Sequence, residues 1–378
     1  MRNKIILING INNSSAGGKT VFLNLIKGIT NYTNRYKFLV LLPNSLQNEI
    51  KELLGNTKVE LIVVKKPNLI GSIYWYFVGL PRIISKRSVD VTINLGDIPI
   101  YMPNCEQIYY FDWSHAIYPE STVWEIFSFK TRISKKIKLY VFKKLFIYNR
   151  HIITQTKTAA ERLKKYYPLK SYSVLNNPVS EIQGVEEDVQ ITFEDPYFHL
   201  FCLTRYYEHK NLESLIPLAK AIKDEKIKVK ILITIDESQG KGAKKLLRNI
   251  RLNKLEDVLI NIGEVNLRQV LYLYRRIDAL FLPTLLESFS GTYVESMFFK
   301  KPILTTDIDF AREICGRGAI YFNPFDTEEQ LNAIKNIIND SDIIKRLVQN
   351  QSDQMKGFIN WEIKTLKIME IIKNILNE

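Results

Sequence analysis

The segment Pro283-Thr-Leu-Leu-Glu287-Ser-Phe-Ser-Gly291-Thr-Tyr-Val-Glu295 joins an apolar run, Ala279 to Leu282, to a helix-like stretch from Tyr293 to Lys300. The apolar run predicts a buried strand, and the Ser/Gly turn after it predicts a helix N-terminus. Such a turn presents unpaired backbone N–H groups in the positive field of the helix dipole, which suits a phosphate. Glu295 lies on the same side of the helix as Gly291, where its carboxylate can accept hydrogen bonds from hydroxyl groups. A ribose next to a diphosphate, as in a nucleotide-sugar, matches this combination.

Glu287 and Glu295 stand one at each end of this turn. Their spacing, with small residues between them and a proline before them, resembles the E-x7-E motif of glycosyltransferase family 4, retaining enzymes of the GT-B fold. A solvated pair of glutamates beside a helix cap is the alternative. The rest of the chain decides between the two interpretations.

Length and composition describe a globular chain of two domains. A chain of 378 residues is too long for one ordinary core and fits two domains of about 150–200 residues. The 3 cysteines are far apart, and no C-x-x-C or Cys/His cluster exists, so zinc and a disulfide framework are not expected. The apolar N-terminal run is too short for a signal peptide, and the apolar region 69–81 is too short to span a membrane. We therefore expect a cytoplasmic protein.

The net charge of +13 predicts a surface that attracts anions. Between Ile126 and Ala160 there is no acidic residue, and basic and apolar residues alternate. The basic ones are Lys130, Arg132, Lys135, Lys136, Lys138, Lys143 and Lys144, and the apolar ones are Phe127, Phe129, Ile133, Ile137, Leu139, Val141, Phe142, Leu145 and Phe146. The stretch 127–148 is typical of a basic amphipathic helix on an anionic membrane, here the inner face of the plasma membrane. A solvated basic face over an ordinary core helix is the alternative. Nucleic acid is not expected, because no recognised binding motif is present.

Strand-like and helix-like segments alternate along the first half of the chain. The predicted strands are 4–10, 37–43, 59–64, 89–95, 107–111, 151–156 and 172–175, and the predicted helices are 20–29, 45–54, 70–84 and 159–166. This alternation predicts a parallel sheet with helices on both faces. The turn Asn176-Asn177-Pro178 predicts a hinge, and the acidic segment Glu181 to Asp195 predicts an interdomain linker.

Two loops of the first half hold candidate site residues. Gly17 and Gly18 are predicted in the loop after the first strand, where a glycine pair lets the backbone approach a phosphate or an acceptor. A Walker A motif is incomplete because Asn13 stands where its first glycine belongs, and a turn without a ligand is a further alternative. Asp112 and His115 follow the strand 107–111, and such loops line the ligand crevice of open α/β sheets. For these two, a loop carboxylate and a buried structural histidine are the alternatives.

A second α/β alternation begins at Phe198. Its predicted strands are 199–204, 229–235, 258–263, 279–282 and 301–306, and its predicted helices include 212–223 and 266–277. Arg205 and Lys210 lie in the first loop, where two cations can converge on a diphosphate, although surface cations without a ligand are common. Asp307-Ile-Asp309 has the D-x-D form that binds manganese in GT-A glycosyltransferases. Because it follows a strand of a βα series, we expect it to be part of a loop and not a metal site.

The resemblance to glycosyltransferase family 4 covers nearly the whole chain, with specific motifs in the second half and mainly architecture in the first. Arg205 to Asn211 resembles the family's G-R-x-x-x-x-K-N segment, with Thr204 in place of the usual glycine. The segment Asp236 to Gly240 replaces the usual G-x-G turn. A histidine often ends the strand by the reacting sugar in this family, whereas Asp112 stands there in this chain.

The resemblance implies an α/β protein of the GT-B fold, with two Rossmann-like β/α/β domains facing a central cleft. Residues 1–180 would bind the acceptor, residues 181–360 would bind the nucleotide-sugar, and the terminal helix 361–378 would pack back on the first domain. The resemblance implies that Arg205, Lys210 and the amides of Ser290, Gly291 and Thr292 bind the diphosphate. Glu287 would bind the transferred sugar, Glu295 the ribose, and Gly263 and Val265 the base. Asp112 or His115 would lie at the reaction centre. No metal or other cofactor is expected.

The expected function is retaining transfer of a sugar from a UDP- or GDP-sugar to a glycan or lipid-linked acceptor. Cell-surface polysaccharide or lipopolysaccharide biosynthesis is the expected setting. A GT-B sugar-nucleotide epimerase would share the fold and the phosphate site without an acceptor. A basic nucleic-acid-binding protein would explain the net charge alone.

Overall fold

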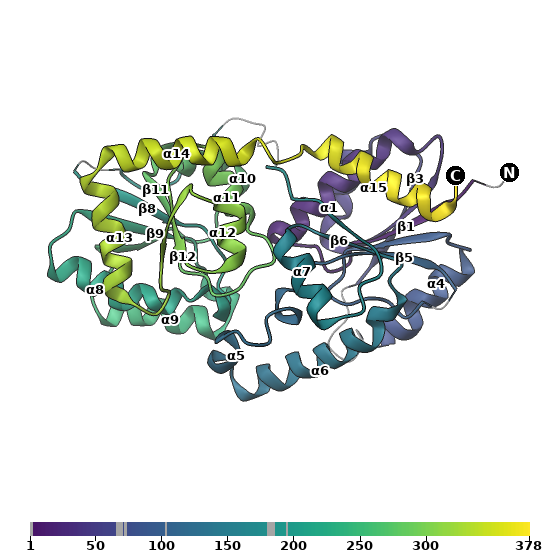
Figure 1. Ribbon diagram of the computed structural model, residues 1–378, viewed down its shortest axis with the longest axis horizontal. Helices are drawn as coiled ribbons and strands as arrows, with labels where there is room; N and C mark the ends of the chain where they lie inside the picture. Colours follow the sequence, from purple (N-terminus) through teal and green to yellow (C-terminus); the bar gives the residue numbers. More distant parts are fainter. Residues whose placement is uncertain (1–2, 66–70, 72–73, 103, 180–185, 194–195) are drawn as a thin grey trace. The chain divides into compact units, whose positions relative to one another are not determined.

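The computed structural model describes residues 3–65, 71, 74–102, 104–179, 186–193 and 196–378 (Figure 1). The chain divides into two compact units. The first unit consists of residues 1–118, 129–180 and 359–378, and the second consists of residues 119–128 and 181–358. Each unit contains one parallel sheet, so the predicted α/β class with two Rossmann-like domains is confirmed.

The sheet of the first unit has seven strands in the order β3-β2-β1-β4-β5-β6-β7. The strands are β1 (Ile5–Asn9), β2 (Lys37–Pro43), β3 (Val59–Val64), β4 (Val91–Asn94), β5 (Glu106–Tyr110), β6 (His151–Thr154) and β7 (Tyr172–Val174). All of their pairings are parallel. The order reverses between β1 and β4, and in open α/β sheets ligands bind beyond the carboxyl ends of the strands at such a switch point.

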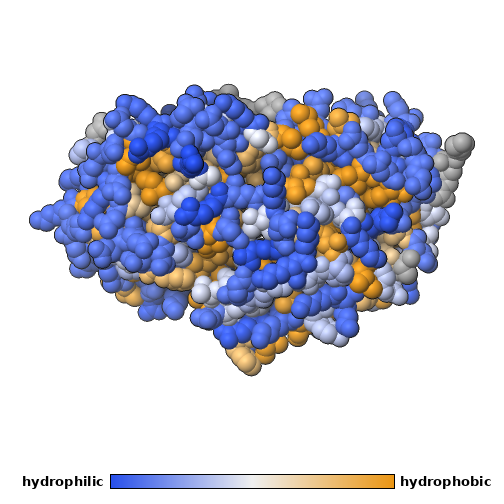
Figure 2. All heavy atoms as spheres, viewed as in Figure 1, coloured by the Kyte–Doolittle hydropathy of each residue, from blue (hydrophilic) through white to orange (hydrophobic). Residues whose placement is uncertain are grey.

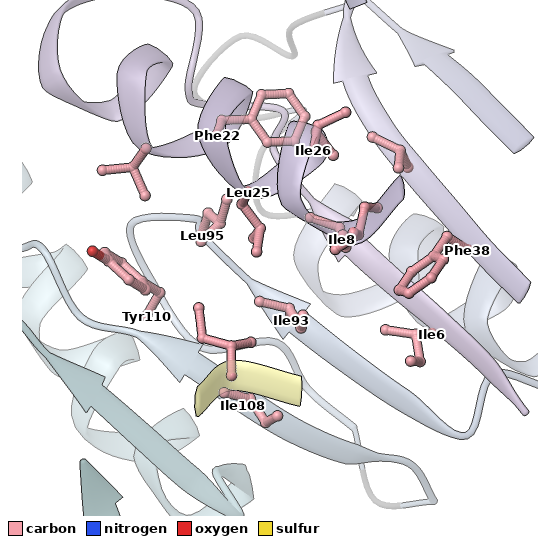
Figure 3. Close-up of a cluster of buried hydrophobic side chains, with 14 of the residues drawn as sticks. Ile6, Ile8, Phe22, Leu25, Ile26, Phe38, Ile93, Leu95, Ile108 and Tyr110 are labelled. Carbon is pink, nitrogen blue, oxygen red and sulfur yellow. The ribbon is translucent and has the colours of Figure 1, made fainter. Parts of the chain in front are cut away.

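Strand side chains alternate between two cores on the two faces of this sheet, as the period of two requires. Ile6 and Ile8 point to one core, together with Phe38 of β2, while Leu7 and Leu39 point to the other. Figure 3 shows the first core, in which side chains of the helix above the sheet meet those of the strands. A sheet that buries both faces needs helices on both sides.

The helices of the first unit supply these covers. They are α1 (Ala16–Ile29), α2 (Gln47–Leu54), α4 (Leu80–Lys86), α6 (Phe129–Leu145), α7 (Lys157–Tyr166) and α15 (Trp361–Leu376), with a π-helical turn at Trp75–Gly79. α15 packs beside α1, and Ile368, Met369 and Ile372 join the core in which Phe22 of α1 lies. The part of the predicted helix 70–84 that falls on residues 70, 72 and 73 lies outside the described residues.

One prediction in this unit is wrong. Gly17 and Gly18 belong to the first turn of α1, which begins at Ala16 and not at Thr20. The first N–H groups of a helix have no intrahelical partner, so glycine costs little there. A Cβ atom at Gly18 would lie 2.9 Å from Nδ2 of Asn13, so a larger residue there would displace the end of that side chain.

The sheet of the second unit has six parallel strands in the order β10-β9-β8-β11-β12-β13. They are β8 (Phe198–Cys202), β9 (Val229–Ile233), β10 (Leu259–Asn261), β11 (Ala279–Leu282), β12 (Ile303–Thr306) and β13 (Ala319–Phe322). The order reverses between β8 and β11. The strand β13 was not among the predicted strands. The segment 181–185 and residues 194 and 195 of the predicted linker lie outside the described residues.

The helices of the second unit are α5 (Val123–Ile126), α8 (Leu215–Asp224), α9 (Lys241–Leu252), α10 (Leu267–Arg276), α11 (Gly291–Phe298), α12 (Asp309–Cys315), α13 (Thr327–Asn339) and α14 (Ser341–Met355). α10 is anchored by a capping box, in which Asn266 and Gln269 satisfy each other's backbone N–H groups. Its inner face, with Leu273 and Tyr274, packs on Phe201 of β8. In the part of the chain that the structure describes, no helix is long and apolar enough to cross a membrane.

Candidate functional site

The two central strands of the second sheet, β8 and β11, bring the loops that follow them side by side. The backbone N–H of Leu285 donates to the carbonyl of His209 at 2.8 Å, which joins the two loops directly. The hydroxyl of Thr284 donates to the same carbonyl at 3.3 Å. This junction is at the switch point of the sheet, where the fold predicts a ligand.

Lys210 and Glu287 form an ion pair at this junction. Their side chains are only 16% and 13% exposed, so the pair is largely shielded from water. Thr284 also donates to Oε1 of Glu287 at 3.3 Å, which fixes the carboxylate from a second side. Thr284 is in turn tied to β12, because the hydroxyl of Thr306 donates to its carbonyl at 2.7 Å. Two residues 77 positions apart are therefore held in one rigid cluster.

The N-terminus of α11 follows Glu287 directly. Ser290 is its N-cap residue, is 4% exposed, and makes no side-chain capping hydrogen bond. Gly291 is exposed, and a Cβ atom at this position would lie 4.0 Å from Oε1 of Glu295. The carboxylate of Glu295 thus lies beside the first turn, as the spacing in the sequence predicts.

Tyr274 of α10 holds Glu295 in this place. Its hydroxyl lies 3.2 Å from Oε2 of Glu295 and 3.2 Å from the carbonyl of Thr292. Burial raises the pKa of the Glu295 carboxyl, and the hydrogen bond from Tyr274 opposes that rise. Nothing in the sequence marked Tyr274 as a site residue, since its spacing predicts only a core position of α10.

Arg205 is engaged elsewhere. Its guanidinium lies 2.6 Å from Oε1 of Glu264, and both side chains are well exposed, at 40% and 49%. Gln239 donates to the same carboxylate at 3.3 Å and accepts from the backbone N–H of Tyr206 at 2.8 Å. Glu264 was not among the predicted site residues, although it lies between Gly263 and Val265, the two predicted base neighbours.

The loop that carries Glu264 is shaped by Gly263, whose φ of +74° favours glycine. No atom lies within 4 Å of the position that a Cβ would occupy, so the backbone of this loop is open to a ligand. Val265 packs instead against the core that contains Tyr274. Gly263 thus leaves open backbone in this loop, whereas Val265 is part of the core.

The D-x-D carboxylates have partners within the protein. Asp307 forms two hydrogen bonds with Arg312, one of them at 2.7 Å, and Asp309 accepts from the N–H of Phe310 at the start of α12. Among the residues that the structure describes, no group of three or more His, Cys, Asp or Glu side chains is arranged to hold a metal ion.

The first unit carries amides at the corresponding position. Nδ2 of Asn9, at the end of β1, donates to Oδ1 of Asn94, at the end of β4, at 2.9 Å. Asn94 donates in turn to Gln107 at 3.1 Å and to the carbonyl of Ile98 at 2.9 Å, and accepts from the N–H of Gly96 at 3.0 Å. This buried network was not predicted, because isolated Asn and Gln residues form no sequence motif.

Asp112 and His115 follow β5 in the first unit. Asp112 is exposed, so the surrounding protein desolvates it only in part, and this desolvation and the nearby Asp97 carboxylate raise its pKa. His115 is 5% exposed, and burial together with Lys135 and Lys138 lowers its pKa to about 3. Its ring stacks on Trp113, with centroids 6.1 Å apart. His115 is therefore neutral at physiological pH, while Asp112 has the exposure that a contact with substrate needs.

Comparison with known proteins supports a class for this fold and site. Residues 185–354 match the family Glycosyl transferases group 1. The match contains Arg205, Lys210, Glu287 and Glu295. The matched segment lies within the second unit and covers less than half of the chain.

The chain is 27% identical over 219 residues to the O-antigen chain mannosyltransferase RfbU of Salmonella typhimurium. The aligned region is 56% of this chain and 59% of that relative, so the likeness covers little more than half of each.

Solved structures with the same fold match over the whole chain. Sucrose-phosphate synthase from Thermosynechococcus elongatus has a TM-score of 0.77 at 11% identity, with 99% of this chain and 100% of that chain covered. Anabaena HepE, solved in complex with UDP and glucose, has a TM-score of 0.69 at 17% identity, with 98% and 100% covered. At these identities the likeness shows a shared fold, and that fold is GT-B.

Proposed function

We propose that this protein transfers a sugar, with retention of its anomeric configuration, from a nucleoside diphosphate-sugar to a hydroxyl group of an acceptor. The observation that carries the proposal is the shielded Lys210–Glu287 pair beside the N-terminus of α11, inside the matched domain. The ammonium of Lys210 and the N-terminus of α11 suit a diphosphate, and the carboxylate of Glu287 suits the hydroxyl groups of a sugar attached to it.

The chemistry of sugar transfer asks for positive charge where the diphosphate leaves. As the bond from the sugar to the β-phosphate breaks, negative charge grows on the phosphate oxygens, and preorganised donors stabilise it. Lys210 and the amides of Gly291 and Thr292 would supply these donors, with Arg205 joining after it releases Glu264. In this proposal, the positive charge of Lys210 and Arg205 stabilises the leaving diphosphate without a metal ion.

The two glutamates would then position the donor. Glu287 is fixed by Lys210 and Thr284, so its free lone pairs can accept hydrogen bonds from hydroxyls of the transferred sugar. Glu295, held by Tyr274, would accept from the ribose hydroxyls. Gly263 would adjoin the base. In the first unit, exposed Asp112 is a better candidate than buried His115 for a contact with the sugar at the reaction centre.

The nucleotide is a UDP or a GDP moiety in this proposal. One relative is an O-antigen mannosyltransferase, and one structural neighbour was solved with UDP and glucose. By analogy with that relative, the acceptor is a glycan or a lipid-linked saccharide of a cell-surface polysaccharide or lipopolysaccharide.

A two-step experiment tests the proposal. Thermal unfolding is first measured with UDP-, GDP-, ADP- and CDP-sugars, and we expect selective stabilisation by one UDP- or GDP-sugar, since a ligand of the folded state raises the melting temperature. Slow transfer of that donor's sugar to water or to an added saccharide is then followed by NMR of the anomeric proton. Retained configuration in the first-formed product supports the mechanism.

Three outcomes contradict it. Stabilisation by none of the sugar nucleotides removes the donor assignment, and an inverted product removes retention. Conversion of the sugar nucleotide into an epimer, without an acceptor, indicates an epimerase instead. The variant Glu295→Ala serves as the site control, because it should weaken the stabilisation by nucleotide without unfolding the protein.

A further inference from the structure

The helix α6 of the first unit exposes an apolar stripe. Phe129, Ile133, Ile137 and Tyr140 are 76%, 42%, 57% and 63% exposed. At 3.6 residues per turn they fall within an arc of roughly 80° on one side of the helix. Ile147, just beyond the end of α6, is 59% exposed in continuation of the same line. Single exposed apolar residues are common on proteins, but a row of large ones on one helix face marks an interaction surface.

Lys130, Lys136 and Lys143 border this stripe, Lys144 lies within it, and no acidic residue does. Lys130, Lys136, Lys143 and Lys144 are all exposed on α6. Lys130 falls on one side of the stripe and Lys136 and Lys143 on the other, while the ammonium of Lys144 lies 5.6 Å from the ring centroid of Tyr140. Apolar groups in the middle and long cationic chains at the margins are the pattern of a helix that lies in a membrane surface.

The opposite face of α6 is fixed to the protein. Phe142 and Leu145 are buried, with Phe142 packed at 5.6 Å against Trp113. Lys138 points the same way, since its ammonium lies 2.8 Å from Asp97 and 4.3 Å from the ring of Trp113. The basic stretch therefore divides into an inner set that packs on the protein and an outer set that is exposed. The sequence alone did not separate them.

Aromatic side chains also cluster beyond the C-terminal end of α6. The ring of Tyr148 meets that of Tyr101 at 5.1 Å, and Tyr101 stacks on Phe77 at 6.2 Å. Tyr101 and Phe77 are both more than one-third exposed. Tyrosine is favoured where one side is apolar and the other is wet, as at the level of lipid headgroups. In Figure 2, orange atoms lie at the bottom of the view, where Figure 1 draws the N-terminal part of α6.

We propose that this face, formed by Phe129, Ile133, Ile137 and Tyr140 with Lys130, Lys136, Lys143 and Lys144 around them, docks on an anionic lipid bilayer. The apolar side chains would insert between the headgroups, and the lysines would bind lipid phosphates. Docking is a property of the first unit and does not depend on the proposed sugar transfer. A second copy of the chain fits less well, because two such faces would set like charges against each other. Nucleic acid fits less well because its phosphates would meet large apolar side chains at the centre of the face.

Co-sedimentation of the full chain with vesicles tests the proposal. Binding is expected to vesicles of equal parts phosphatidylglycerol and phosphatidylcholine, to weaken as salt is added, and to be weak with phosphatidylcholine alone. The apolar variant Phe129→Ser/Ile133→Ser/Ile137→Ser and the charge variant Lys130→Gln/Lys136→Gln/Lys143→Gln should each bind at least about tenfold more weakly.

Matched controls come from the second unit. Lys241→Gln/Lys244→Gln/Lys245→Gln removes the same charge from exposed positions of α9, and Leu252→Ser removes an exposed apolar side chain. Both should bind vesicles like the unmodified protein, and all variants should keep its melting temperature, since every changed residue is exposed.

Several results overturn the proposal. Equal binding by the apolar variant and the unmodified protein would leave only non-specific charge attraction. Salt-dependent binding of RNA or DNA that outcompetes vesicles and survives the apolar substitutions would assign the face to nucleic acid. A dimer in solution that the apolar variant loses would assign it to a second copy. Absence of vesicle binding by the unmodified protein rejects it outright.

Discussion

The two sheets of this protein are built alike but end in different chemistry. Both have a parallel strand order that reverses in the middle, between β1 and β4 in the first unit and between β8 and β11 in the second. In the first unit the switch point is bridged by two amides, Asn9 and Asn94. In the second it is bridged by an ion pair, Lys210 and Glu287.

We call the carboxyl ends of β1 and β4, with Asn9 and Asn94, the neutral edge. We call the carboxyl ends of β8 and β11, with Lys210 and Glu287, the charged edge. An ammonium paired with a carboxylate can also bind a phosphate, so the second unit can take up a doubly charged leaving group. The side chain of Asn94 has two donor and two acceptor contacts within the protein, and it offers a rigid frame rather than charge. In the proposed reaction, the second unit therefore holds the diphosphate, and the buried amides of the first unit fix the ends of β1 and β4.

The largest effect on activity is expected when the positive charge of Lys210 is removed from the charged edge. Lys210→Ala is expected to lower kcat/KM for the donor by about 100- to 1,000-fold, since a preorganised donor to the developing charge is lost and Glu287 is left without its partner. Turnover of the donor identified by thermal shift provides the measurement. Lys223→Ala, which removes an exposed lysine paired with Asp257, is the control and should leave kcat/KM unchanged. Equal activity of Lys210→Ala and the control would remove the ion pair from the site.

A smaller effect is expected in the first unit, on the dependence of stability on pH. Burial lowers the pKa of His115 to about 3, below its ordinary value of 6.5, so the unfolded chain binds this proton first as the pH falls. Stability is therefore lost progressively from about pH 6.5 towards pH 3, by about 2 kcal/mol at pH 5. Urea unfolding at several pH values measures it. His115→Asn should flatten this slope, whatever its effect on stability at pH 8, and an unchanged slope would show that His115 titrates freely in the folded state.

Much of this fold can be predicted from short apolar runs, because a buried parallel strand must be apolar on both faces. The predicted strands 37–43, 59–64 and 279–282 coincide with β2, β3 and β11. The strand β13 was not predicted, although β3, which is also an edge strand and is less buried, was predicted with its bounds. The start of α1 was misplaced because glycine pairs usually signal a loop, whereas here Gly17 and Gly18 lie in the first turn of the helix.

The sequence predicted which residue types form the candidate site, but it predicted few of the contacts between them. Lys210 and Glu287 were assigned to phosphate and sugar separately, and their direct pairing depends on β8 and β11 being neighbours, which spacing alone does not reveal. Arg205 was expected to join Lys210. Its orientation is set by Glu264, which belongs to a loop 59 residues away in sequence and carries no motif of its own. Local patterns identify which groups are present, and sheet order determines which of them meet.

The smallest effect is expected on donor binding when the ion pair of Arg205 and Glu264 is removed. This prediction tests how the charge of the second unit is balanced. Arg205 and Glu264 are both more than one-third exposed, so their ion pair contributes little to stability, and Glu264→Gln should change the free energy of unfolding by less than about 0.5 kcal/mol. Binding of the donor should instead tighten by about two- to fivefold, because Arg205 no longer has to leave a carboxylate before it reaches the phosphates. Titration calorimetry with the donor measures the difference, and Glu237→Gln, which removes a similar exposed partner of Arg251, is the matched control. Weaker binding by Glu264→Gln than by the control would mean that Glu264 itself contacts the donor, and the charge of the second unit would then be balanced by two carboxylates and not by one.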